Sequence, residues 1–272
     1  MRLLFVGDVV GKPGRAALAQ HLPGLIEDLR IDFTVVNGEN SAHGFGITPS
    51  TFEAIVDAGA DAITLGNHTF DQKVVIGLLE SDDRIVRPAN FPVGTPGRGS
   101  FLFETKGGAR VLVANVMGQL FMHPMLDDPF AAADRILDGI DLGGSADAIL
   151  FDFHAEATSE AQCFGHHLDG RVSVVVGTHT HVPTADHRVL PSGTAYQSDT
   201  GMTGAFDSSI GMDKEEPLAR FVRKMGSARM EVATGPATMC ALAVEISDRT
   251  GLAERVAPVR LGGDLEEARP DW

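Results

Sequence analysis

The sequence predicts an α/β fold. Short β-rich runs alternate with segments of helical pattern along most of the 272 residues, which is typical of a largely parallel sheet covered by helices. Polar side chains that can bind a metal ion follow several of these runs directly, at the carboxyl ends where open α/β sheets bind ligands. The apolar runs are spread evenly and are enough for one large core, so we expect residues 1–272 to form a single domain.

Runs rich in β-branched and other apolar residues predict the strands, because such runs suit a buried pleated sheet. The runs at residues 101–105 and 110–115 are separated by a short Gly-rich segment, which predicts a hairpin and an antiparallel part of the sheet. The remaining strands are expected at residues 2–6, 33–36, 62–65, 148–153, 172–176, 194–197, 237–246 and 255–260.

Start signals predict the helices. Thr48 supplies an N-cap and Pro49 a first-turn proline, so a helix begins there. Residues 11–15 are Gly- and Lys-containing but lack the spacing of a phosphate-binding loop, and we interpret them as a turn into a helix over residues 15–30. Further helices are expected at residues 73–79 and from residues 155–160 onward.

Composition and charge exclude several classes of protein. A formal charge of −15 without a cluster of Lys and Arg argues against a surface that holds long nucleic acid. No apolar run approaches the length of a membrane span, and the start turns acidic at Asp8, too early for a signal peptide, so we expect a cytoplasmic protein without membrane contact. Cys163 and Cys240 cannot form a disulfide framework and are expected to be buried small hydrophobes.

His179 and His181 stand one residue apart just beyond the apolar run at residues 172–176. If that run is a strand, both imidazoles can reach a site at its carboxyl end, and two imidazoles so close indicate a metal site. The alternative is a pair of loop histidines without function. Several other predicted strands are also followed directly by side chains that can bind a metal ion, and this favours the metal site.

Those strand ends carry carboxylates, amides and a further imidazole. Each has an ordinary alternative: Asp8 could cap a helix, and the Asn37-Gly38 pair before Glu39 is a strong turn signal. Their shared position just after apolar runs favours a common site. The strand-end residues are Asp8, Glu39, Asn40, Asn67, His154, His179 and His181, with His68 beside them.

These side chains form a nitrogen and oxygen ligand set without a thiolate. Such a set suits Fe, Mn or Zn and does not distinguish among them. It is large enough for two metal ions, and a single carboxylate such as Glu39 could bridge ions about 3.5–4 Å apart. Metal pairs of that kind activate a water for attack at phosphorus.

The order of these motifs resembles that of the calcineurin-like metallophosphoesterases over about residues 2–183. Each block is weak alone, but the ordered set is highly specific. The chain departs from most of that superfamily in two ways: Val10 stands where the usual DxH motif has its histidine, and Glu39 stands where most members have Asp. The matching blocks are Gly7-Asp8, Gly38-Glu39-Asn40, Gly66-Asn67-His68, His154 and Gly177-Thr178-His179-Thr180-His181.

Both departures fit the bacterial YmdB-like subfamily, which the chain resembles closely. The subfamily pattern is matched by GDVVGKPGR, NGENSAHGFGIT, GNHTFD, FHAEATSE and GTHTHVPTAD, which begin at residues 7, 37, 66, 153 and 177. The resemblance implies a four-layer α/β/β/α sandwich. It also implies hydrolysis of 2′,3′-cyclic and related cyclic nucleotides, which are small substrates.

The resemblance further implies a role for each motif residue. His68, which is not a ligand, would protonate the leaving oxygen after a hydroxide bridging two metal ions attacks phosphorus. Fe or Mn is expected, with Zn as an alternative. One ion would take Asp8, Glu39, Asn40 and His181, with Asn40 replacing the missing histidine, and the other would take Glu39, Asn67, His154 and His179.

Two other functions remain open. The chain could be a phosphomonoesterase, or a regulatory module that holds a nucleotide or RNA end with little turnover. A complete ligand set together with His68 favours an enzyme, because a pure binder has no need of a general acid. A closed homo-oligomer is expected, as is usual for soluble bacterial enzymes.

Overall fold

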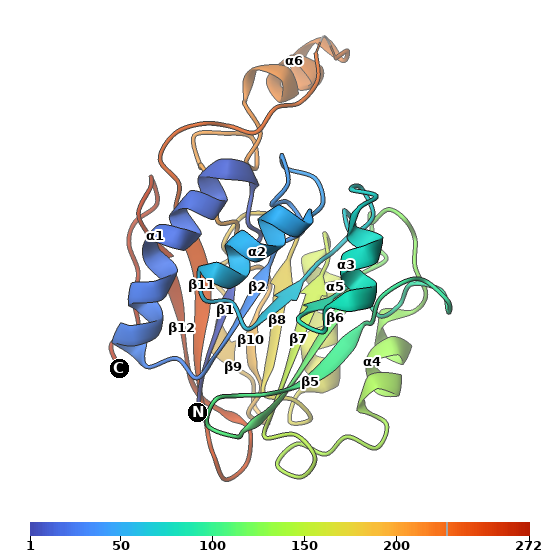
Figure 1. The fold of residues 1–272 in the computed structure, drawn as a ribbon, viewed down its shortest axis with the longest axis vertical. Helices are drawn as coiled ribbons and strands as arrows, with labels where there is room; N and C mark the ends of the chain where they lie inside the picture. Colours follow the sequence, from blue (N-terminus) through green and yellow to red (C-terminus); the bar gives the residue numbers. More distant parts are fainter. Residues whose placement is uncertain (227) are drawn as a thin grey trace.

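Two six-stranded sheets form the centre of the protein, and the computed structural model describes them within residues 1–226 and 228–272 (Figure 1). The first sheet has the strand order β12-β11-β1-β2-β3-β4. Strands β1 to β4 are mutually parallel, whereas β11 pairs antiparallel with both β1 and β12. These strands are β1 (Arg2–Val6), β2 (Phe33–Asn37), β3 (Ala62–Thr64), β4 (Ile85–Val86), β11 (Met239–Ile246) and β12 (Ala253–Leu261).

The second sheet has the order β5-β6-β7-β8-β10-β9. Its strands β6, β7, β8 and β10 are parallel, and the predicted hairpin of β5 and β6 is confirmed as an antiparallel pair. Strand β9 closes the far edge antiparallel to β10. The strands are β5 (Ser100–Glu104), β6 (Arg110–Met117), β7 (Ala148–His154), β8 (Val174–Thr178), β9 (Arg188–Val189) and β10 (Ala195–Gln197).

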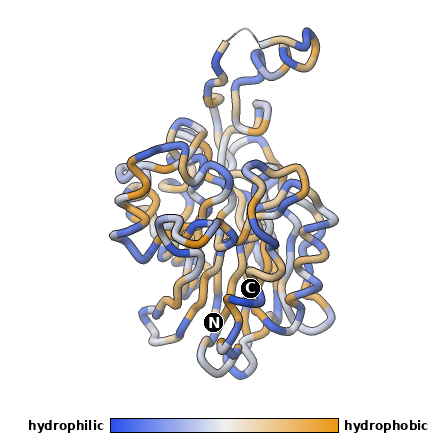
Figure 2. Tube along the Cα trace, turned by 90° about the vertical axis from the view of Figure 1, so that its right-hand side faces the viewer, coloured by the Kyte–Doolittle hydropathy of each residue, from blue (hydrophilic) through white to orange (hydrophobic). Residues whose placement is uncertain are grey.

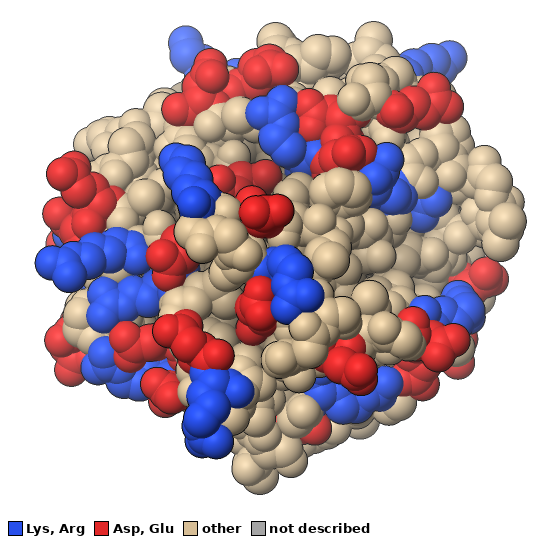
Figure 3. Space-filling model, turned by 60° about the horizontal axis from the view of Figure 1, so that its bottom comes forward, with Lys and Arg blue, Asp and Glu red and all other residues tan. Residues whose placement is uncertain are grey.

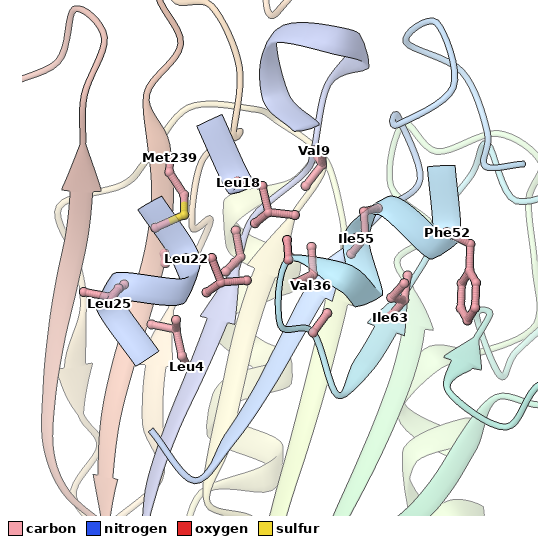
Figure 4. Packing of buried hydrophobic residues seen from close by; sticks show 14 of the residues in the cluster. Leu4, Val9, Leu18, Leu22, Leu25, Val36, Phe52, Ile55, Ile63 and Met239 are labelled. Atoms are coloured by element: carbon pink, nitrogen blue, oxygen red, sulfur yellow. The ribbon is translucent and has the colours of Figure 1, made fainter. Parts of the chain in front are cut away.

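Helices cover the outer face of each sheet. Leu18 and Leu22 of the first helix and Ile55 of the second belong to one buried cluster with the first sheet (Figure 4). Phe164 belongs to the cluster on the outer face of the second sheet. The predicted four-layer α/β/β/α arrangement is therefore confirmed. The covering helices are α1 (Gly11–Leu29), α2 (Pro49–Asp57), α3 (Val75–Ser81), α4 (Pro129–Leu137) and α5 (Thr158–Leu168).

Alternation of side chains along the strands explains how each sheet is held on both faces. In β1, Leu3 and Phe5 join the cluster between the sheets, whereas Leu4 and Val6 join the cluster under α1. Burial of one such side chain contributes about 1.5–3 kcal/mol. Packing on both faces fixes the carboxyl ends of the two sheets relative to each other, which is the condition for a site shared between them.

Helix α1 begins four residues earlier than predicted. Residues 11–15 are its first turn, not a turn before it. Pro13 is tolerated there because the first amide groups of a helix have no intrahelical partner. Gly14 is required by a close approach: a Cβ atom at this position would clash with the carbonyl oxygen of Thr203.

Two helices, α4 and α6, were not predicted. Helix α6 (Glu215–Arg223) lies in a projection beyond the body, seen at the top of Figure 1 and again in Figure 2. We call residues 209–226 and 228–232 the arm, because backbone bridges from Met212 to Ser209 and Val232 close its base. Phe221 of α6 is 75% exposed and Leu218 is 61% exposed, so the apolar face of this helix has little packing against the described part of the chain.

Both cysteines are free, as expected, but their environments differ. Cys240 lies buried in β11, whereas Cys163 is exposed on α5, so the prediction that Cys163 is buried is wrong. The buried face of α5 is formed instead by its neighbours Ala161 and Phe164. Within residues 1–226 and 228–272, no helix has the length and apolar character needed to cross a membrane.

Candidate metal centre

The predicted site residues meet where strands of both sheets end. Asp8 follows β1, Glu39 and Asn40 follow β2, and Asn67 follows β3 in the first sheet. His154 is the last residue of β7, and the two histidines of the HxH pair follow β8 in the second sheet. Because the strands within each set are parallel and in register, their ends align at one edge of the sandwich.

His154 is the centre of one group of contacts. Its Nε2 atom lies 3.1 Å from Oε1 of Glu39, 2.9 Å from Oδ1 of Asn67 and 3.1 Å from Nδ1 of His179. The ligand atoms of Glu39, His154 and His179 all lie within 4.8 Å of one another. The two sheets thus contribute to a single cluster that could hold a metal ion.

A second group lies around His181. Its Nε2 atom is 3.3 Å from Oδ1 of Asn40 and 3.9 Å from Oδ1 of Asp8. The other oxygen of Asp8 accepts a hydrogen bond from the backbone N–H of His179, at 3.3 Å, which connects this group with the first. All the residues predicted as metal ligands are therefore brought together.

Hydrogen bonds behind the site orient the ring of His154. The Nδ1 atom of His154 lies 2.8 Å from the hydroxyl of Thr178, and that hydroxyl donates to Oδ1 of Asp152 at 2.6 Å. Since the hydroxyl uses its proton on Asp152, it accepts from Nδ1–H of His154. In the neutral ring this leaves the lone pair of Nε2 facing Glu39 and Asn67, as in the outer-shell contacts that orient metal-bound histidines.

His181 and Asn40 are oriented in the same way. Nδ1 of His181 lies 2.8 Å from the carbonyl oxygen of Ile210, which can only accept, so the ring donates there and its Nε2 lone pair faces the site. The amide nitrogen of Asn40 donates to the carbonyl oxygen of Gly44 at 3.0 Å, which turns the amide oxygen of Asn40 toward His181. Electron-pair donors from both sheets therefore converge on this site.

The electrostatics of the cluster favour a bound cation. Burial raises the pKa of Asp8 well above its usual range against the opposing effect of His154, and nearby carboxylates add to the rise. Burial would lower the pKa of His154, but Glu39, with Asp8 and Asp152, raises it to about 9. Burial would likewise raise the pKa of Glu39, but His154 lowers it to about 2. Burial and the neighbouring His154 lower the pKa of His179 to about 3.

These residues fit a metal centre by their chemistry. Oδ1 of Asp8 is buried and has no hydrogen-bond partner among the described residues, and such an atom costs free energy unless a ligand satisfies it. The Nε2 atom of His181, 3.9 Å from this oxygen, is itself oriented as an electron-pair donor. Oxygen and imidazole donors arranged in this way suit Fe, Mn or Zn.

His68 lies at the edge of the cluster. Its backbone N–H donates to Oε2 of Glu39 at 3.0 Å, while its imidazole Nδ1 lies 2.8 Å from Oδ2 of Asp71. The side chain is 25% exposed, and its ring meets the ring of Phe45 edge-on at 5.1 Å between centroids. Among the described residues, the ring of His68 makes no hydrogen bond to a predicted ligand, which distinguishes it from the other site histidines.

The cluster opens into a cavity of about 290 Å³. Glu39, His68 and His181 form part of its polar wall, whereas Phe45 and Phe221 supply aromatic rings to its apolar wall. Phe221 comes from α6 and therefore from the arm. A site with one charged wall and one aromatic wall suits a ligand that combines a phosphate with a flat apolar group.

Several residues that shape the site were not predicted. Asp71 could have been found from its place three residues after His68, and Asp152 from the appearance of a carboxylate inside an apolar run. The carbonyl of Ile210 and the ring of Phe221 left no such signal, because a backbone acceptor and an exposed aromatic have no characteristic spacing.

Comparisons with known proteins identify relatives over nearly the whole chain. The family model described as YmdB-like protein matches residues 4–259. A 2′,3′-cyclic-nucleotide 2′-phosphodiesterase of Bacillus subtilis (strain 168) is 44% identical over 264 residues, which cover 97% of this chain and 98% of that protein.

Solved structures show the same fold over nearly the whole length. A hypothetical protein from Thermus thermophilus has a TM-score of 0.89 and 45% identity, covering 97% of this chain and 100% of that one. A structure described as that of a novel phosphatase of Mycoplasma pneumoniae has a TM-score of 0.90 and 33% identity, covering 97% of this chain and 94% of that one.

Proposed function

The chain belongs to the YmdB-like protein family, and from this membership and its site we propose that it is a metal-dependent phosphodiesterase acting on 2′,3′-cyclic and related cyclic nucleotides. The observation that carries the proposal is the convergence of buried carboxylate, amide and imidazole donors from both sheets on one cluster. The related Bacillus subtilis protein is named for this reaction, and this chain covers 98% of it.

We assign the donors to two metal ions. Glu39 is proposed as the shared ligand, because its Oε1 contacts His154 of the first group and its charge raises the pKa of both Asp8 and His181 in the second group, against the larger effect of burial on His181. Two bound ions would lower the pKa of a water and neutralise charge on the phosphoryl oxygens. The first ion is assigned to Asp8, Glu39, Asn40 and His181, and the second to Glu39, Asn67, His154 and His179.

His68 is proposed as the general acid for the leaving oxygen. Asp71 accepts a hydrogen bond from Nδ1 of His68 and so orients the ring, which leaves Nε2–H as the proton that can be donated. The ring lines the cavity beside Glu39, so it can reach a ligand held there without being a metal ligand itself. In the reaction the phosphorus–oxygen bond to the 2′ oxygen breaks, water supplies oxygen to phosphorus, and His68 supplies a proton to the 2′ oxygen.

The rest of the cavity is proposed to hold the nucleoside. Phe45 and Phe221 offer ring faces or edges to a base, and stacking on an aromatic ring is tolerant of base identity. A cavity of about 290 Å³ is at the small end of the range for ligand sites, which favours a mononucleotide-sized group at the centre. On the bottom face of the molecule, basic and acidic side chains are interspersed without a continuous basic track, so this face does not favour binding of long nucleic acid (Figure 3).

A direct assay tests the proposal against a phosphomonoesterase, the alternative favoured by the similarity to the Mycoplasma pneumoniae phosphatase. Purified protein loaded with Fe, Mn or Zn is given a 2′,3′-cyclic nucleotide and, separately, a nucleoside 3′-monophosphate. We expect hydrolysis of the cyclic substrate and accumulation of the monophosphate. Faster release of inorganic phosphate from the monophosphate would contradict the proposal.

The metal identity and the setting of the reaction are also proposals. We propose Fe or Mn, with Zn as the alternative, because the ligand set accepts all three and metal supply decides among them. Elemental analysis of protein purified without added metal measures this directly. A cytoplasmic location is proposed because both cysteines are free, as is usual in a reducing compartment. A homo-oligomeric state is proposed because most soluble oligomers are closed, symmetric homo-oligomers.

A further inference from the structure

A second and larger cavity lies beside the candidate metal centre. It has a volume of about 870 Å³ and is lined by the start of α1, by His43 and Gln72, and by residues 229–235 at the base of the arm. This is near the upper end of the volumes typical of ligand sites, so it can hold a group larger than a single ion. The reaction proposed above makes no use of it.

The two cavities share a wall. Met230 lines both of them. His43 lines the larger cavity and lies in the sequence between Asn40 and Gly44, which line the smaller one. The start of α1 contacts the same loop, because the N–H of Gly11 donates a hydrogen bond to the carbonyl oxygen of Asn40 at 2.9 Å. The larger cavity is therefore the immediate neighbour of the one at the metal centre.

The charge of the larger cavity differs from that of the whole chain. Lys12 and Arg229 line it, with Glu231 as the acidic residue of the described lining, whereas the whole chain has a formal charge of −15. Within residues 1–226 and 228–272, neither Lys12 nor Arg229 makes an ion pair, so no carboxylate of the described chain neutralises either charge. Two unpaired cations at one cavity favour an anionic ligand.

We propose that the larger cavity binds the nucleotide preceding the cyclic end of a short oligoribonucleotide, with Lys12 and Arg229 contacting its phosphate. This rests on the proposed function of the metal centre and adds a substrate class to it: short RNA fragments that end in a 2′,3′-cyclic phosphate. Phosphate contacts from Lys and Arg hold a strand without reading its sequence, so the site accepts any base at this position.

The chemistry of the substrate places this enzyme after an RNA-cleaving reaction. A 2′,3′-cyclic phosphate forms when a ribose 2′ oxygen attacks the adjacent phosphodiester and expels the 5′ oxygen of the next nucleotide. Water then adds at phosphorus, the bond to the 2′ oxygen breaks, and that oxygen takes a proton. The product is an oligonucleotide with a 3′-phosphate, and no oxidant or reductant is required.

Kinetics of paired substrates test the proposal. The metal-loaded enzyme is assayed with a 2′,3′-cyclic mononucleotide and with a dinucleotide that ends in the same cyclic nucleotide. We expect kcat/KM for the dinucleotide to exceed that for the mononucleotide by about threefold to tenfold at low salt, and the advantage to shrink as salt screens the phosphate contacts. Binding of the two corresponding 3′-phosphate products, measured by calorimetry, should show the same preference.

Variants that remove a positive charge test whether the larger cavity is responsible for the preference for the dinucleotide. Lys12→Met and Arg229→Met should each lower the ratio of dinucleotide to mononucleotide kcat/KM by about threefold to tenfold. Lys106→Met and Arg249→Met are matched controls, because both side chains are exposed and line neither cavity. These controls should leave the ratio at its wild-type value.

The outcomes separate the two proposals. If the wild-type enzyme hydrolyses the mononucleotide but treats the dinucleotide no better, the larger cavity has no role and the proposed function stands. If the dinucleotide has the higher kcat/KM and keeps it in both Lys12→Met and Arg229→Met, its phosphate is contacted elsewhere. The assignment of the larger cavity is then overturned. If no cyclic substrate is hydrolysed under any metal, the proposed function itself is wrong.

Discussion

Glu39 is the residue proposed to serve both contact groups. Its Oε1 lies 3.1 Å from Nε2 of His154 in the first group, and its charge acts on Asp8 and His181 in the second. Glu39→Gln keeps the shape of the side chain but removes the charge, so we expect the protein to lose metal at both positions and not only one. The measurement is the number of metal ions per chain after dialysis.

Glu156→Gln is the control for this variant. Glu156 also contacts the site, at 3.3 Å from Nε2 of His179, but its side chain is 49% exposed and it was not predicted as a ligand. It should retain wild-type metal content. Two tightly bound ions per chain in Glu39→Gln would refute the shared-ligand assignment.

His68 permits a test of acid catalysis that leaves the metal centre intact. Loss of a general acid costs about 10²–10⁴-fold in rate when the leaving group needs a proton. His68→Ala should therefore keep its metal and lose turnover of a 2′,3′-cyclic nucleotide to this extent. The loss should be much smaller for a p-nitrophenyl phosphodiester, because nitrophenolate leaves without protonation. Equal losses on both substrates, or loss of metal, would show that His68 is a positioning group or a ligand.

The sequence predicted which side chains gather in the cluster better than it predicted the residues that orient them. Asp8, Glu39 and His154 were recognisable because each follows an apolar run, and parallel strands bring such positions together. The Asp152 carboxylate behind His154 acts through Thr178, and this relation depends on the register of β7 and β8, which the sequence alone does not supply.

Helix α6 shows why some elements of secondary structure could not be predicted from the sequence. Its first residues, Glu215, Glu216 and Pro217, suggest a loop, and its apolar side chains have no sheet beneath them to give the pattern a recognisable context. Strands β4 and β9 were missed because each has two residues, too few to show alternation. Apart from α4, the covering helices and the long strands, which face a packed core, were predicted with small errors at their ends.

Phe221 gives α6 a testable role. If its ring stacks on the base of the substrate, Phe221→Ala should raise KM for a cyclic nucleotide by about 5- to 150-fold, from the ~1–3 kcal/mol typical of base stacking, with a smaller change in kcat. Phe221→Trp should restore binding. Leu218→Ala is the matched control, because Leu218 lies on the same helix and is 61% exposed but does not line the cavity. A similar loss in Leu218→Ala would mean that the whole helix face, not stacking, is responsible.

Metal removal should affect the stability of the entire fold, because the centre connects both sheets. A ligand that binds only the folded state stabilises it by mass action, so chelation should lower Tm. In the metal-free protein the pKa of His154 is raised from 6.5 to about 9, so the stabilisation that its protonated ring gives is complete below pH 6.5 and is lost as the pH rises through 9. The metal-bound protein lacks this dependence, since the ring must be neutral to bind.

The difference in Tm between loaded and chelated protein should therefore widen from pH 6.5 to pH 9. Calorimetric scans of both forms across this range measure it, and His167→Ala serves as a control because His167 pairs with Asp134 on the outer helices, away from the centre. A difference that stays constant or narrows with rising pH would contradict the assignment of His154 as a neutral ligand.

The position of β11 between β1 and β12 has a consequence for synthesis of the chain. Every proposed ligand has been made once His181 is complete, yet β1 gains its second neighbour only when Met239–Ile246 arrives. Until then a ribosome-bound chain has a full set of proposed metal donors while the β1 edge of the first sheet is open, and open edges pair readily with other chains. The edge of β1 is therefore closed only after residues 239–246 have been made, late in synthesis.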